Sequence, residues 1–172
     1  MPTKVNLNFP KSLWTERDSM RLAMDTLGYI KLRTSNGIDA NGAKFKGYST
    51  KPILIAKRGA KLKPKGGVES RSGKSVYYAG GYKEYKHKSR ERSNAPGSTD
   101  SAEVDLVLSG NMMNSLEVKE VKITGFKIGL NQHAQYGYTV NEEREFLGID
   151  EPKGVNLIVS IVEAEVRKKI TK

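Results

Sequence analysis

Gly73, Lys74 and Ser75 are the residue types that end a phosphate-binding P-loop, where backbone N–H groups and a lysine converge on the phosphates. A P-loop also requires a glycine five positions before the first of them and a helix after them. Position 68 is Val68 instead, and the residues that follow Ser75 have the apolar, aromatic character of a strand. The sequence therefore does not favour nucleotide binding.

Two histidines and one acidic pair are the other candidates for chemistry. His87 lies among cations in KEYKHKSRER, and His133 in NQHAQYGY has no Ser or Asp at a spacing typical of a catalytic triad. The pair Glu142-Glu143 precedes Arg144 and is better explained by solvation or an inter-subunit salt bridge. The chain has no cysteine for a thiolate nucleophile, and two histidines are too few for a histidine-rich metal site. We therefore predict no enzymatic activity, no metal and no cofactor.

The positive charge of the chain is concentrated in one segment. Fifteen Lys and Arg residues lie between Lys44 and Arg92 against three acids, so this segment carries +12 and the rest of the chain −1. Such a segregated excess builds a local positive field and indicates an anionic partner. The candidate residues for a subunit interface or a DNA-facing arm are Lys57, Arg58, Lys61, Lys63, Lys65, Arg71, Lys74, Tyr77, Tyr78, Tyr82, Lys83, Tyr85, Lys86, Arg90 and Arg92.

The tyrosines interleaved with these cations have three explanations. They could stack on bases while the cations neutralise phosphates, as in nucleic-acid-binding proteins. They equally suit strand packing or a protein interface, where an apolar ring with a polar tip is useful. A solvated basic face without function is the third explanation. Composition does not choose between the first two.

The elements that would position these residues begin with a helix. Leu13, Met20, Ala23, Met24, Leu27 and Ile30 recur at intervals that predict an amphipathic helix over residues 11–33, with Ser12 as its N-cap. Asn36-Gly37 and Asn41-Gly42 predict tight turns. Short apolar pieces at 53–56 and 76–78 predict short strands or an extended basic hairpin arm over about 44–100, with residues 59–74 poorly ordered in the isolated protein.

The C-terminal part predicts further elements. Residues 104–108 have strand character, and Ser109 could cap a short helix that runs to Leu116 and buries Met112 and Met113. Alternating apolar residues about Gly125 predict a β-hairpin, followed by a brief helical turn and a buried turn at REFLGID. A last helix would turn inward Ile158, Ile161, Val162 and Val166.

Together these elements predict a single α+β domain, with two main helices packed on a small antiparallel sheet and a long basic hairpin arm. A length of 172 residues fits one domain. No stretch approaches the roughly 18 apolar residues that span a bilayer, and MPTKVNLNFP lacks the apolar run of a signal peptide, so we expect an intracellular product.

Several pieces of the sequence, in this order, resemble one protein family. A Gly-x-Asp-x-x-Gly turn that ends in Tyr-Ser is matched by Gly37, Asp39, Gly42, Tyr48 and Ser49, and AGGYKEYKHKSR follows at 79–90. The pattern Asp-Leu-x-x-Ser-Gly-x-Met-x-x-Ser-Leu is matched by Asp105, Leu106, Ser109, Gly110, Met112, Ser115 and Leu116. The piece REFLGID then supplies Arg144, Phe146, Leu147 and Gly148. This combination resembles the virion-morphogenesis family of tailed phages, the neck or tail-completion proteins of long-tailed phages and their Mu-like relatives.

The resemblance implies a structural virion protein with no catalytic residues. Its small α+β protomers would form a sixfold or twelvefold ring that joins the head connector to the tail tube around a DNA channel. The implied partners are other copies of the chain, the portal or connector protein, and the tail-terminator or tail-tube protein, with non-specific contact to duplex DNA in the channel. The implied location is the virion, and the host cytoplasm during assembly.

Residues 51–75 depart from the family in length and basicity. We expect residues 57–74 to become ordered against a neighbouring ring or to face the channel, as suits an assembly arm. The alternative from another class is a nucleic-acid-binding accessory protein that uses the Lys-, Arg- and Tyr-rich residues 74–92.

Overall fold

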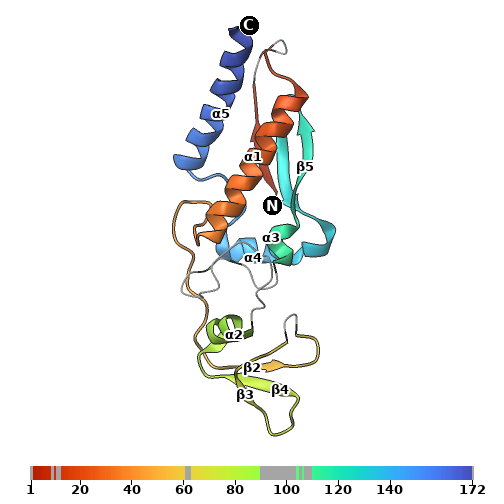
Figure 1. The fold of residues 1–172 in the computed structure, drawn as a ribbon, viewed down its shortest axis with the longest axis vertical. Helices are drawn as coiled ribbons and strands as arrows, with labels where there is room; N and C mark the ends of the chain where they lie inside the picture. Colours follow the sequence, from red (N-terminus) through yellow and green to blue (C-terminus); the bar gives the residue numbers. More distant parts are fainter. Residues whose placement is uncertain are drawn as a thin grey trace.

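The computed structural model describes residues 2–8, 10, 13–60, 63–89, 104, 106 and 110–171. They form an elongated molecule with two lobes, a large one and a small one, joined by extended chain (Figure 1). The small lobe, residues 49–89, contains β2 (Ile53–Ala56), β3 (Val68–Glu69), β4 (Ser75–Tyr78) and α2 (Gly81–Ser89). The large lobe contains β1 (Thr3–Asn6), α1 (Glu16–Ser35), α3 (Asn111–Asn114), β5 (Leu116–Lys122), β6 (Gly125–Leu130), α4 (Tyr136–Arg144) and α5 (Lys153–Ile170). The predicted α+β class is confirmed.

The sheet of the large lobe has the order β1-β6-β5 and is antiparallel throughout. β5 and β6 are the predicted hairpin, and its covered face buries Phe126, Ile128 and Leu130. Gly125 is required because its φ is 148° and a Cβ there would lie 2.0 Å from the Val5 carbonyl oxygen. β1 was not predicted, since its four residues carry no apolar run and their place depends on pairing with β6.

Helix α1 lies on this sheet and begins at Glu16 rather than at residue 11. Thr15 caps it: its hydroxyl accepts from the Asp18 amide, and the Asp18 carboxylate accepts from the Thr15 amide at 2.8 Å. The predicted cap Ser12 lies outside the described residues. Met20 and Met24 are exposed, contrary to the predicted apolar stripe. The buried side of the helix includes the polar residues Ser19, Thr26 and Thr34 instead. It is therefore rotated away from Met20 and Met24.

Helix α5 packs against α1 in antiparallel orientation (Figure 1). Arg21 of α1 and Glu165 of α5 form an ion pair at 3.0 Å, and Asp18 pairs with Lys169 one turn further on. Val162 is buried against the core, and Ile158, Ile161 and Val166 are half-buried beside it, as predicted.

The small lobe has its own core. Its antiparallel sheet has the order β2-β4-β3, and α2 packs on one face, where its Tyr85 is buried with Val76 and Tyr78 of β4. The predicted short strands are confirmed, but α2 occupies residues that an extended arm would have included. Residues 63–74 fold back on the lobe, where the Tyr78 hydroxyl donates to the Lys65 carbonyl oxygen at 2.9 Å, instead of extending as an arm.

The segment before β5 differs in detail from its prediction. α3 is shorter than expected: it ends at Asn114, and Leu116 opens β5. Its N-cap is Gly110, with φ of 82°, while the expected cap Ser109 lies outside the described residues, as does Asp105. The predicted strand at 104–108 is described only at Val104 and Leu106, neither of which is in a strand. Met112 and Met113 are buried, as predicted.

After the hairpin, the predicted brief helical turn is longer. A 3-10 turn (Gln132–Ala134) leads into the nine-residue helix α4. The REFLGID turn follows, and it buries Phe146 and Leu147 as predicted.

Candidate functional site

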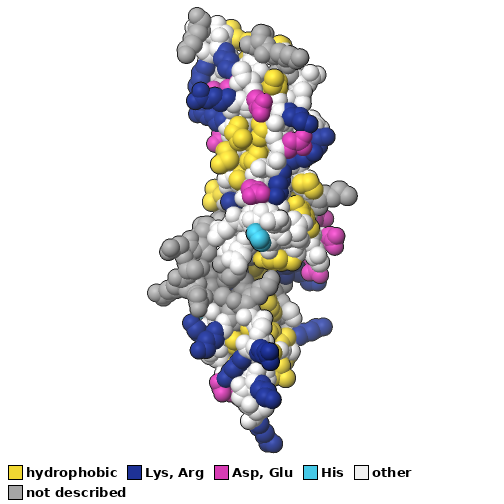
Figure 2. Space-filling view, turned by 90° about the vertical axis from the view of Figure 1, so that its right-hand side faces the viewer, with side chains coloured by type: hydrophobic (Ala, Val, Ile, Leu, Met, Phe, Trp, Pro, Cys, Tyr) yellow, Lys and Arg dark blue, Asp and Glu magenta, His cyan; other side chains and the backbone are white. Residues whose placement is uncertain are grey.

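The basic segment forms the surface of the small lobe (Figure 2). Lys57 pairs with Glu69 at 2.5 Å, and Lys88 with Glu84 at 2.5 Å. Seven other exposed cations of this lobe have no ion pair with a described residue: Lys51, Arg58, Lys63, Lys65, Arg71, Lys74 and Lys83. We call them the unpaired cations. The candidates Lys61, Arg90 and Arg92 lie outside the described residues.

Most of the candidate tyrosines serve the core of the small lobe. Tyr78 and Tyr85 are buried with ring centroids 5.4 Å apart, and Tyr82 lies 5.9 Å from Tyr85. Lys86 is buried as well. The explanation of Tyr78 and Tyr85 as base-stacking residues is therefore wrong, because their faces are covered by the lobe itself.

Tyr77 is the exception among these residues and lies on the outer face of the sheet, away from α2. Its register partners are Leu54 on β2 and Val68 on β3. Tyr77 is 40% exposed, Leu54 is 63% exposed and Val68 is 69% exposed. We call them the outer row. The sequence showed the residues but not their register across three strands.

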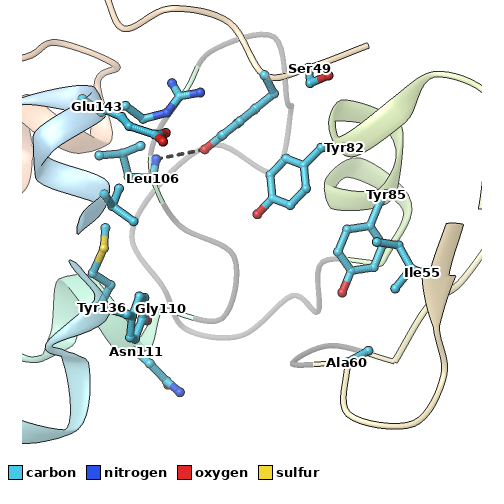
Figure 3. Close-up of a pocket in the computed structure, with 14 residues that line it drawn as sticks. Ser49, Ile55, Ala60, Tyr82, Tyr85, Leu106, Gly110, Asn111, Tyr136 and Glu143 are labelled. Atoms are coloured by element: carbon cyan, nitrogen blue, oxygen red, sulfur yellow. Dashed lines mark hydrogen bonds between the residues drawn. The ribbon is translucent and has the colours of Figure 1, made fainter. Parts of the chain in front are cut away.

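A cleft of about 580 Å³ separates the two lobes (Figure 3). From the small lobe Ile55, Tyr82 and Tyr85 point into it, and from the large lobe Tyr136 and Glu143 do. Other lining residues are Tyr48, Ser49, Ala60, Leu106, Gly110, Asn111, Met112, Val140 and Arg144. The cleft is mainly apolar, and Glu143 and Arg144 are the charged residues of its lining.

Tyr48 connects the lobes at one side of this cleft. Its hydroxyl accepts a hydrogen bond from the Lys86 ammonium at 2.8 Å and another from the Leu106 amide at 3.2 Å, dashed in Figure 3. The Arg144 guanidinium lies 5.1 Å from its ring centroid. Tyr48 therefore links Lys86 of α2 to Arg144 of α4, while within the small lobe the Ser49 carbonyl oxygen accepts from the Lys83 amide of α2.

The glycine turn of the same motif packs on the REFLGID turn. Gly37 and Gly42 have φ of 77° and 79°, as the turn prediction requires. The Asp39 carboxylate accepts from the backbone amides of Asn41 and Ala43. A Cβ at Gly148 would lie 2.7 Å from Ala40 Cβ, so these two motifs are in close contact. The residues of these two motifs shape the turns and their packing on each other.

A buried polar network fastens α1 to the segment before α5. Arg33 donates to Asp150 at 3.0 Å and to the carbonyl oxygens of Gly148 and Phe146, and Tyr29 donates to Asp150 at 2.7 Å. Burial alone would raise the pKa of Asp150, but the hydrogen bonds from Tyr29 and Arg33 lower that pKa below its ordinary value. Burial and the Asp150 carboxylate raise the pKa of Tyr29 to about 12. Sequence reasoning missed this network, although Arg33 follows Ile30 on the buried side of the helix.

Helix α5 leaves part of its apolar surface uncovered. Of its 18 residues only Gly154 and Val162 are buried. Apolar residues at i, i+4, i+7, i+11 and i+15 form one stripe along it, and Val155, Val159 and Ile170 of that stripe are exposed. We call Val155, Val159, Val162, Val166 and Ile170 the α5 stripe.

Within the described part of the chain, no group of three His, Asp or Glu side chains could hold a metal ion. No helix among those residues is long and apolar enough to cross a membrane. Comparisons of the chain with known protein families, with curated proteins and with solved structures find no match.

Proposed function

We propose that this protein is a structural component of a phage virion that assembles into a ring in the neck or upper tail, between head connector and tail tube. The proposal joins the motif resemblance described above to the surface of the folded chain. Its mechanism is assembly around a DNA channel, and the partners are further copies of the chain and the connector and tail proteins on either side.

The α5 stripe is the observation that carries this proposal. Only two of the 18 residues of α5 are fully buried, and Val155, Val159 and Ile170 of the stripe remain exposed in the monomer. Subunit contact would bury the exposed members of the stripe, and each large aliphatic side chain removed from water contributes about 1.5–3 kcal/mol. Apolar helix faces of this kind mark interaction surfaces in soluble proteins.

The two-lobed shape and the charge distribution support the same proposal. The small lobe carries the unpaired cations (Figure 2), and the large lobe carries the exposed apolar residues of α5. A ring that places small lobes toward its centre would present cations to the phosphates of DNA in the channel.

Negative-stain imaging of the purified protein tests the proposal. We expect closed rings with an open centre at concentrations where the chain assembles. Compact particles without a centre, or single two-lobed molecules at every concentration, would contradict it. A position of the gene between portal or capsid genes and the major tail protein gene would support the class independently.

Nucleic-acid binding is the second candidate, and the seven unpaired cations favour it. The burial of Tyr78 and Tyr85 removes most of the stacking surface that this function would use. Binding to duplex and single-stranded DNA over a salt series separates the two candidates. Submicromolar affinity at physiological salt with a steep salt slope would favour the accessory-protein function, whereas a ring protein should bind DNA weakly and without sequence preference.

A further inference from the structure

Helix α1 has an exposed apolar flank on the side away from α5. In Figure 1, α5 lies on one side of α1, and β5, an edge strand of the sheet, lies on the other. Met20 is 46% exposed and Met24 is 55% exposed. They lie about 120° or more round the helix from Asp18 and Tyr29, which contact α5 and the turn before it. The two methionines are therefore on the β5 side of α1.

Strand β5 extends this apolar flank. Val118 pairs with Ile128 and Val121 with Phe126, so both valines lie on the face of the sheet that packs on α1. Both are half-buried, and no described strand pairs with the outer edge of β5. Figure 2 looks onto this side of the molecule and shows hydrophobic side chains gathered on the large lobe. We call Met20, Met24, Val118 and Val121 the α1–β5 flank.

The α5 stripe lies on the opposite side of the large lobe. Helix α5 faces α1 with Gly154, Glu165 and Lys169, and the exposed members of the stripe lie outside that contact. The pair of helices is thus open on both sides, since α5 has no helix beyond it and α1 has none over β5 (Figure 1). With 20 and 18 residues, α1 and α5 are about 30 and 27 Å long, so a second α5 would match the length of α1.

Cations stand at both ends of the methionine pair. Arg17 precedes Met20 by three residues and Lys31 follows Met24 by seven, so all four lie along one side of α1. Neither cation has an ion pair with a described residue. A partner of this flank should therefore combine apolar side chains with negative charge.

The α5 stripe offers that combination. Glu163 follows Val159 by four residues and precedes Ile170 by seven, so it lies beside the exposed part of the stripe. Its side chain is 59% exposed and lies 3.7 Å from Arg167 of the same helix, a surface pair of little strength. The stripe and the α1–β5 flank therefore match in length, in apolar character and in charge.

We propose that the α5 stripe of one copy packs on the α1–β5 flank of the next copy. The contact joins two different surfaces on opposite sides of the lobe, so it is heterologous and repeats from copy to copy until a ring closes. The methionines and valines lose water in it, and Glu163 faces the cations of α1. This inference rests on the proposed ring and names the surface that receives the stripe.

Complementation between two blocked chains is the first test. Met24→Glu places a carboxylate in the flank and leaves the stripe intact, whereas Val159→Glu does the reverse. Each variant alone should stay monomeric at concentrations where the wild type assembles. A one-to-one mixture should form dimers of about 38 kDa, twice the 19.1 kDa chain, and nothing larger, because one intact flank meets one intact stripe and the other two surfaces are blocked.

Leu32→Glu is the matched control for Met24→Glu. Leu32 also belongs to α1, is 62% exposed and lies about 80° round the helix from Met24, outside the flank. This variant should assemble as the wild type does. Circular dichroism checks that each variant is folded, and Met20→Glu replaces Met24→Glu if the latter is not. A mixture of folded variants that stays monomeric would overturn the contact.

The second test reverses charges on both sides. Glu163→Lys and Arg17→Glu/Lys31→Glu should each weaken assembly, and the chain that carries all three substitutions should regain it, because opposite charges face each other again. Failure of the combined variant to recover would overturn the contact.

The outcomes also separate this contact from the ring itself. If the wild type forms rings and Val159→Glu blocks them while Met24→Glu does not, the stripe meets another surface, so the contact is wrong and the ring stands. If neither variant changes the assembly of the wild type, the contact is likewise wrong. If the wild type stays monomeric at every concentration, both the contact and the ring are wrong.

Discussion

The Arg33 guanidinium and the Asp150 carboxylate lie 3.0 Å apart inside the large lobe, although 117 positions separate them in the sequence. Arg33 belongs to α1, and Asp150 ends the turn that leads into α5. Their contact therefore helps to fix how α5 sits on α1, and with it where the α5 stripe faces. Assembly depends on this pair in our account, even though neither residue would touch a second subunit.

The first prediction concerns the stability of this pair. Arg33→Met should lower the free energy of unfolding by about 3–5 kcal/mol, because it leaves the Asp150 carboxylate buried without its cation. Arg21→Met breaks a surface ion pair with Glu165 and should cost less than about 1 kcal/mol. Urea unfolding of both variants measures the difference. Equal losses of unfolding free energy would show that the buried pair contributes no more than the surface ion pair.

The second prediction concerns acid. The pKa of Asp150 is lower in the folded protein than its ordinary value of 3.8, so as pH falls the unfolded chain takes up this proton first. The stabilisation is thus complete well above 3.8 and is lost as pH falls through the folded pKa. The difference in unfolding free energy between the wild type and Asp150→Asn should shrink as pH is lowered from neutral toward about 3. A constant difference over that range would contradict this role.

The third prediction concerns Tyr29. Its pKa of about 12 is raised above the ordinary 10.0 by burial and by Asp150. Its contribution to stability is therefore present below pH 10 and decreases as pH rises from there toward 12, since the unfolded chain ionises first. The ultraviolet difference titration between the wild type and Tyr29→Phe should show its step near 12, and Asp150→Asn should move that step downward. A step near 10 in the wild type would argue against the hydrogen bond.

The fourth prediction concerns the α5 stripe. Val159→Glu places a carboxylate in the stripe and should abolish assembly without unfolding the monomer, because the position is exposed. Ser160→Glu adds the same charge to the next residue, which is exposed and lies about 100° round the helix from Val159, outside the stripe, and should leave assembly intact. Light scattering gives the mass of each variant. Assembly of both variants at the wild-type concentration would exclude the stripe as a contact.

The parts of the fold that follow local rules were predictable. Asn36-Gly37 and Asn41-Gly42 gave turns with positive φ, and alternation about Gly125 gave the hairpin. Helix α2 was not predictable in this way. Its inward side combines the half-buried Tyr82 and the buried Tyr85 with the buried Lys86, and the helix depends on Gly81, where a Cβ would lie 2.4 Å from the Lys51 carbonyl oxygen.

The candidate site was predictable as a region but not as a surface. Charge counting located the small lobe, yet it could not separate the buried Tyr78 from its exposed neighbour Tyr77, because that depends on which face α2 covers. The outer row requires the register of three strands, and the Arg33–Asp150 pair requires two distant segments to meet. Neither relationship leaves a local pattern in the sequence.

Native mass spectrometry of the wild-type protein tests the central claim, closed self-assembly, most directly. One chain has a mass of 19.1 kDa, so six copies correspond to about 115 kDa and twelve to about 229 kDa. The account predicts one dominant species at such a closed multiple, in exchange with the monomer. A 19.1 kDa species alone at every concentration, or an open series of multiples without a preferred size, would contradict it.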